Sequence, residues 1–292
     1  MLKQLNSKTC SFTRFISNDF IDLDFPRKDS ISVERGFSTK FSCLDEALNG
    51  QIKQGLYVLF STEQKPSLGL MTQLAEAAVE QEFGAIFVFP MNYLSILPAF
   101  IYSRQSLLYD FPNAKPVEQL LPFSSEIRHS LSKTVQEKGR ALTQNMAFLH
   151  SYGLKPPYFK TQMESLFQYP NKFICFIDAS DQNQDDFLLN LQAYHQLTEE
   201  WAIPIFIYRK IPLRIAQNDF NPTNFMDEAC QYADYAIFMK RYSTQKTVLS
   251  NINQQTPDWL LYQIHVMSSY LSPEFSTSFL SFYHQFGLFE EA

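Results

Sequence analysis

Glycine is scarce in this chain, with 8 copies among 292 residues, less than half of the average usage of about 7%. Loops that wrap closely around phosphate groups depend on glycine, so few segments could form one. The four cysteines, Cys10, Cys43, Cys175 and Cys230, are scattered and form no Cys-x-x-Cys pair. This distribution argues against a disulfide framework and against a zinc site, so we expect no metal and a reducing, cytoplasmic setting.

Continuous apolar runs are also missing where targeting would need them. The opening residues, MLKQLNSKTCSFTRF, lack the apolar core of a secretory signal. The charge-free segment from Phe83 to Tyr102 is long enough to span a membrane, but Pro90, Asn92 and Pro98 interrupt it. We interpret it as a buried strand followed by a helix, and we expect no membrane partner.

Positive charge is limited, whereas aromatic residues are abundant. The net charge is −6, which disfavours a dedicated nucleic-acid binder, because such proteins usually carry a basic surface. A small basic cluster still exists at Lys240, Arg241 and Lys246. With 28 phenylalanines, the chain has a large apolar area to bury, either in its own core or against partners.

Short apolar runs alternate with helical patterns along most of the chain. The runs predict buried strands at Leu56–Phe60, Ala85–Phe89, Met146–His150, Phe173–Ile177, Ile203–Tyr208 and Tyr235–Met239. A short helix is expected at Ser42–Leu48, and longer ones at 68–82, 92–108, 124–145, 185–200 and 223–232. Crossovers of this length predict a mostly parallel α/β sheet. We divide the chain into an N-terminal extension (1–38), an α/β domain (39–241) and a C-terminal extension (242–292).

The C-terminal extension carries a repeating phenylalanine pattern. We predict one helix beginning at Thr256-Pro257-Asp258 and a second beginning near Pro273. On the second, rings recur at spacings of three and four, which puts them on one helix face, at Phe275, Phe279, Phe282, Phe286 and Phe289. Two interpretations stay open, packing on the chain's own domain and docking onto another chain. We expect Phe275 and Phe279 to pack inward, and Phe286 and Phe289 to contact a partner.

The segment from Tyr57 to Thr72, YVLFSTEQKPSLGLMT, has the strand, loop and helix order of a phosphate-binding loop. Such a loop has the form G-x-x-x-x-G-K-[ST], in which backbone N–H groups and the lysine hold the phosphates and the hydroxyl holds Mg²⁺. Here Gly69 is followed by Leu70 and Met71. The scaffold is therefore expected to remain without its charged and metal-binding groups.

The order of segments across residues 36–241 resembles the C-terminal RecA-like ATPase domain of DnaB-type replicative helicases, particularly the helicase-like ATPases of mobile elements. The segments are GFSTKFSCLDEALNGQIKQGLYVLF, PSLGLMT, AIFVFPMNYLSIL, FICFIDASDQ, IPIFIYRK and PTNFMDEACQYADYAIFM. The resemblance implies an α/β RecA-like fold, a mostly parallel sheet flanked by helices. To this fold we add an N-terminal arm and a helical C-terminal extension.

The resemblance also assigns positions to a degenerate nucleotide site. PSLGLMT is similar to the family's Pro-Ser-Leu-Gly-Lys-Thr-Thr, which places that site at Ser67, Gly69, Leu70, Met71 and Thr72. Met91 falls near the family's water-activating glutamate, and Asp178 matches its Mg²⁺-associated acid. A second interpretation of Asp178 stays open, that it caps the turn after its strand. A clear arginine finger is not recognisable.

These departures favour a non-catalytic RecA-like protein that binds protein, either by self-association or by joining a related ATPase. We expect no cofactor, and residual binding of ATP and Mg²⁺ stays an open question. A second hypothesis is an ATPase with a divergent loop in which Lys65 reaches the phosphates. A third is a single-stranded-DNA-binding module that uses exposed aromatics and the cluster near Lys240. DNA translocation is disfavoured, because acidic residues fill a loop that faces nucleic acid in the resembled fold, at Asp178, Asp181, Asp185 and Asp186.

Overall fold

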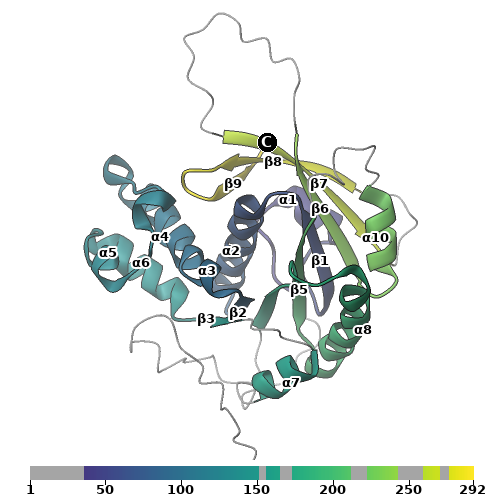
Figure 1. Cartoon of the computed structure of the whole chain (residues 1–292). Coiled ribbons are helices and arrows are strands. Elements are labelled where there is room, and N and C mark those ends of the chain that lie inside the picture. Colours follow the sequence, from purple (N-terminus) through teal and green to yellow (C-terminus); the bar gives the residue numbers. More distant parts are fainter. Residues whose placement is uncertain (1–35, 151–155, 165–172, 212–221, 243–258, 270–275) are drawn as a thin grey trace, which may run out of the picture.

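A nine-stranded sheet forms the centre of the molecule (Figure 1), with the strand order β3-β2-β4-β5-β1-β6-β7-β8-β9. The computed structural model describes residues 36–150, 156–164, 173–211, 222–242, 259–269 and 276–292. The extension predicted for residues 1–38 lies almost entirely outside these ranges, so it stays a prediction.

The first six strands are parallel and follow the predicted apolar runs. They are β1 Gly55–Ser61, β2 Gly84–Phe89, β3 Met146–His150, β4 Phe173–Asp178, β5 Pro204–Lys210 and β6 Tyr235–Arg241. Every residue of β1 and β2 is buried, as expected for strands that are covered on both faces. The predicted mostly parallel α/β sheet is therefore confirmed.

Helices cover both faces of the parallel part of the sheet (Figure 1). One face carries α1 Ser42–Ala47, α2 Gln64–Glu80, α3 Met91–Leu94, α4 Ile96–Tyr109, α5 Ser125–His129 and α6 Lys133–Thr143, with short 3-10 turns η2 Phe111–Asn113 and η3 Val117–Leu120. The other face carries α7 Pro156–Glu164, α8 Gln184–Trp201 and α10 Pro222–Cys230. The charge-free segment 83–102 forms β2, α3 and the start of α4. Within the described ranges, no helix is long and apolar enough to cross a membrane.

The predicted helical C-terminal extension is wrong, because the described part of this region is made of strands. β7 Trp259–Ser268, β8 Ser276–Tyr283 and β9 Leu288–Glu291 extend the sheet beyond β6 as antiparallel neighbours. Alternate residues of β7 enter the core, including Tyr262 and Ile264. A turn at Gly287, with φ of 62°, folds β9 back along β8. The spacing of three and four that we assigned to one helix therefore runs, from Phe279 onward, through two strands and the turn between them.

The phenylalanines of the predicted stripe consequently do not share a face. Phe282 and Phe289 are each 1% exposed, and their ring centroids lie 4.6 Å apart. Phe279 is 37% exposed on the opposite side of β8, and Phe286 is half-buried in the turn. Phe275 lies outside the described residues. The expectation that Phe279 packs inward and Phe289 contacts a partner is therefore wrong, because Phe289 is buried and Phe279 points outward.

A buried arginine joins the C-terminal hairpin (residues 276–291) to α2 and α4. Arg104 is 2% exposed, and its guanidinium donates to the Glu76 carboxylate at 2.9 and 3.0 Å, to Thr72 Oγ1 at 2.9 Å and to the Gly287 carbonyl at 2.6 Å. A Cβ at position 287 would lie 1.9 Å from the Phe100 ring. Glycine is thus required here both by its left-handed backbone and by this close approach.

The free edge of β9 is occupied by a side chain of α2. Gln73 Nε2 donates to the Phe289 carbonyl at 2.8 Å, and Gln73 Oε1 accepts from the Phe289 N–H at 2.8 Å. The glutamine amide therefore makes the pair of bonds that a further strand would make. At the end of β9, the Glu291 carboxylate accepts from the Cys43 N–H at 2.9 Å, at the start of α1. The hairpin is therefore bonded to α1 and α2 and belongs to the same packed domain.

Shortening Phe289 to alanine should lower the free energy of unfolding by about 3–5 kcal/mol, because a fully buried ring would be lost. The matched change Phe279→Ala should cost less than about 1 kcal/mol, because that ring is partly exposed. Urea denaturation followed by circular dichroism measures both. Equal losses from the two variants would contradict the inward packing of β9.

Candidate functional site

The carboxyl ends of the parallel strands bring the predicted nucleotide-site positions to one edge of the sheet. Ser67 to Thr72 lie in α2, which follows β1. Met91 is the first residue of α3, directly after β2 and Pro90. Asp178 is the last residue of β4. In open parallel sheets, ligands bind outside this edge, so the candidate positions share the edge at which such folds hold their ligands.

The predicted phosphate-binding loop is replaced by helix. α2 begins at Gln64, four residues before the predicted start, so only residues 62 and 63 separate it from β1. Pro66 lies in the first helical turn, where proline is tolerated because the N–H it lacks has no partner within the helix. Ser67 Oγ donates to the Glu63 carbonyl at 2.8 Å. Beyond the first turn, the N–H groups of PSLGLMT are bonded within the helix rather than directed at a ligand.

The side chains at the motif positions are part of the apolar core. Leu70 is 1% exposed and Met71 is fully buried, and both belong to the cluster beneath α2. A Cβ on Gly69 would lie 2.9 Å from the Phe282 ring of the hairpin. Thr72 Oγ1 donates to the Leu68 carbonyl at 2.9 Å and accepts from Arg104. These positions therefore hold the hairpin against α2.

Asp178 closes the turn after β4, which was the second interpretation of this residue. Its Oδ1 accepts from the Ser180 N–H at 2.9 Å, whereas Oδ2 is buried without a hydrogen-bond partner among the described residues. Burial is the largest cause that raises the pKa of this carboxyl above its ordinary value, and the bonds to Ser180 oppose it. The carboxyl is thus shifted toward its neutral form.

Tyr208 fills the space beside Asp178, and the sequence analysis did not identify it. It lies on β5 directly opposite Asp178 and is fully buried. Burial raises the pKa of its hydroxyl, the charge of Asp178 adds to this shift, and the hydroxyl of Ser67 opposes it. A tyrosine within the apolar run IPIFIYRK was the available signal. For Arg104, the signal was a lone cation in the helix ILPAFIYSRQSLLY.

The two remaining candidate groups lie near the surface of the molecule. Met91 is 44% exposed at the sheet edge. Lys65, which the divergent-loop hypothesis directs at phosphates, forms an ion pair with Glu118 of η3. The lysine is therefore already paired with a carboxylate on the outside of α2.

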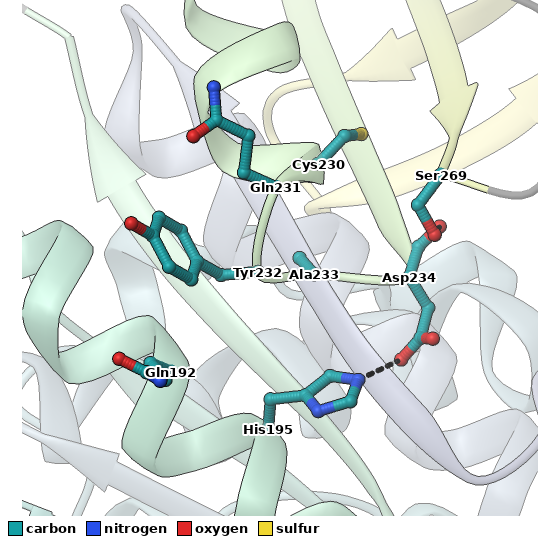
Figure 2. A pocket seen from close by; sticks show the side chains of 8 residues that line it. All are labelled: Gln192, His195, Cys230, Gln231, Tyr232, Ala233, Asp234 and Ser269. Atoms are coloured by element: carbon teal, nitrogen blue, oxygen red, sulfur yellow. Dashed lines mark hydrogen bonds and ion pairs between the residues drawn. The ribbon is translucent and has the colours of Figure 1, made fainter.

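A pocket of about 360 Å³ opens at the opposite, amino-terminal edge of the sheet. Figure 2 shows His195 of α8 pointing at Asp234, with 3.6 Å between Nε2 and Oδ2. The Asp234 carboxylate also accepts from the Leu56 N–H at 2.7 Å. The backbone carbonyl of Asp234 accepts from the Ser269 N–H at 2.9 Å. Asp234 thus joins the start of β1, the end of β7 and α8. None of the predicted site residues lines this pocket, whose walls are Gln192, His195, Cys230, Gln231, Tyr232, Ala233, Asp234 and Ser269.

Replacing Asp178 by asparagine should stabilise the protein at pH 7, because the asparagine oxygen can still accept from Ser180 while no charge is buried. A carboxyl whose pKa is raised by folding stabilises the fold fully below its unfolded pKa of about 3.9, and this contribution is lost as pH rises through the folded pKa. The advantage of the variant should therefore shrink as pH falls from 7 to 4.

Urea denaturation across this pH range measures the effect, and Asp227→Asn, at an exposed position of α10, is the control. A variant that is less stable than the parent at pH 7, or an advantage that is independent of pH, would contradict the burial of Asp178.

Comparisons with known proteins give a match in structure alone. No family model matches the sequence, and no curated protein matches it. One solved ATPase domain of a DnaB-like helicase is 12% identical with a TM-score of 0.60, over 88% of this chain and 92% of that chain. A DnaB-like replicative helicase, from a structure that describes its interactions with primase, is 12% identical with a TM-score of 0.60, over 89% of this chain and 64% of that chain. The chain therefore has the RecA-like fold of DnaB-like helicase ATPase domains.

Proposed function

We propose that this protein is a non-catalytic relative of the DnaB-like ATPase domains that acts by binding other proteins. One observation supports this most, that the segment at the position of the family's phosphate-binding loop is helical, with Leu70 and Met71 in the core. Side chains buried in this way are not available to hold the phosphates of a nucleotide.

Chemical requirements support the same conclusion. Phosphoryl transfer depends on positioning and on neutralising the charge that spreads over phosphate oxygens. Leu70 supplies no cation, Met71 no oxygen for Mg²⁺, and Met91 no carboxylate to orient water. Asp178 has a raised pKa, whereas a metal ligand needs a carboxylate that ionises readily. We infer that the residues at this edge do not fit a magnesium nucleotide.

Binding to protein is the role that such a fold retains without chemistry. The DnaB-like helicase with a similar fold was solved to describe interactions with primase. RecA-like domains assemble side by side, so a non-catalytic copy can occupy a subunit position, complete a neighbour's site or block ring closure. We place this protein in the cytoplasm as an accessory or regulatory subunit of a replication or mobile-element ATPase, or as a partner to itself.

Neither alternative gains support from a specific contact. The divergent-loop ATPase requires Lys65 to leave Glu118. The DNA-binding hypothesis is disfavoured by the net charge of −6 and by the exposed carboxylates of Asp181, Asp185 and Asp186, which repel phosphates. The last two lie in the first turn of α8, where they stabilise the helix end.

The purified chain should release no phosphate from Mg²⁺-ATP above background, because its motif supplies neither the cation nor the metal ligand. Millimolar Mg²⁺-ATP should also shift the melting temperature by less than about 1 °C, because a ligand that does not bind adds no stability. Phosphate release and thermal unfolding measure these two outcomes. Turnover that disappears in Asp178→Ala would refute the proposal.

Restoring the motif in the double variant Leu70→Lys, Met71→Thr should destabilise the protein and produce no turnover. The lysine would bury an ammonium without a partner, at a cost of about 3–5 kcal/mol, and the position of Met91 would still lack a carboxylate. Leu70→Met is the matched control and should cost less than about 1.5 kcal/mol. A stable double variant that hydrolyses ATP would show that the site is open after all.

A further inference from the structure

The outer side of strands β6 to β9 presents aromatic and aliphatic side chains that face away from α1 and α2. Alternate residues of these strands point outward, and we call the outward set the open face: Tyr242, Trp259, Leu261, Phe279, Tyr283 and Leu288. Tyr242 and Trp259 are each 41% exposed and Phe279 is 37% exposed. The Tyr242 and Phe279 rings meet edge to face, with centroids 5.3 Å apart.

The open face has no cover from the elements that the structure describes there. The inner side of these strands packs on α1 and α2. On the outer side, α10 lies against β7 near Met267, which is buried. The aromatic end of the face extends beyond it. Clustered exposed aromatics on an antiparallel sheet are typical of a binding surface.

Charges of opposite sign border this face on its two sides. Lys240 points outward from β6, in the row of Gln263 and Phe279. Glu290 points outward from β9, in the adjacent row opposite Ser281. No salt bridge involves Lys240 or Glu290 within the described residues. Across the strands, the open face therefore has the cation of Lys240 at one side, an apolar centre, and the anion of Glu290 at the other side.

We propose that the open face binds the open face of a second copy of this chain. A two-fold axis parallel to the strands would lay β6 of one subunit over β9 of the other, so that Lys240 approaches Glu290 of the partner subunit twice in the dimer. The apolar centres then pack as two sheets do, at about 10 Å separation. Such an isologous contact requires a self-complementary surface, and this charge order provides it.

The proposal rests on the proposed function, because it names the surface and the partner through which a non-catalytic chain acts. Single-stranded nucleic acid is the weaker occupant, since the face offers one lysine and carries a carboxylate of its own. From strand spacing and rise, the face covers on the order of 300 Å², below the roughly 800 Å² per partner of standard interfaces. A dimer that dissociates in the micromolar range is therefore expected.

Sedimentation equilibrium of the full chain between 1 and 100 µM, as an order-of-magnitude range for weak association, should show a monomer–dimer equilibrium. Phe279→Ser, Lys240→Glu and Glu290→Lys should each weaken it about fivefold or more. The double variant Lys240→Glu, Glu290→Lys should regain most of the parent's affinity, because the charge order is then reversed on both subunits. Phe111→Ser on η2, where the ring is 74% exposed, and Lys133→Glu on α6 are matched controls and should change nothing.

A second readout uses Trp259, which is one of 2 tryptophans. In the variant Trp201→Phe, emission should shift to shorter wavelength as concentration rises, because dimerisation removes Trp259 from water. A monomer at all concentrations, a dimer that is insensitive to Phe279→Ser, or a charge swap that restores nothing would each overturn the proposal. Binding of oligo(dT) that is lost in Phe279→Ser, with a monomeric parent, would assign the face to nucleic acid instead. ATP turnover in the parent would refute the proposed function but would leave a measured dimer standing.

Discussion

Arg104 is a charge inside the core that cannot be removed alone, because Glu76 would then be buried without a counter-ion. Its guanidinium also bonds Thr72 and the Gly287 carbonyl, so one side chain fixes the distances between α2, α4 and the C-terminal hairpin. The burial of Leu70, the contact between Gly69 and Phe282, and the inward packing of Phe289 all depend on that arrangement. The candidate site and the tail of the chain are thus one packed unit.

The parallel half of the fold could be predicted because its strands are buried on both faces, so each one is a short apolar run between helical patterns. The tail could not, since the helical spacing of its phenylalanines coincides with two strands, in which Phe279 and Phe282 lie on opposite faces of β8 and Phe289 lies on β9. The alternation of outward and inward residues on β7 would have predicted a strand. This alternation is a weaker signal than the phenylalanine spacing, which repeats across a turn.

The sequence singled out the residues of the candidate site but not their local structure. The resemblance assigned Asp178 and the motif residues to one site, and the fold brings them to one edge of the sheet. It did not reveal that α2 starts at Gln64, because Pro66 and Ser67 are typical of a loop as well as of a first helical turn. Tyr208 and Arg104 were missed for a different reason. Their partners are distant in sequence, and only the packed structure shows that they fill the space beside the motif.

The glutamine at position 73 has a consequence for how copies of this chain can meet. A strand at the end of a sheet is a template for adding further strands, and uncontrolled addition leads to fibrous aggregates. By occupying the Phe289 N–H and carbonyl with one amide, Gln73 blocks that template. Further chains therefore cannot extend the sheet across this edge. A dimer formed through the outward side chains of the sheet remains possible.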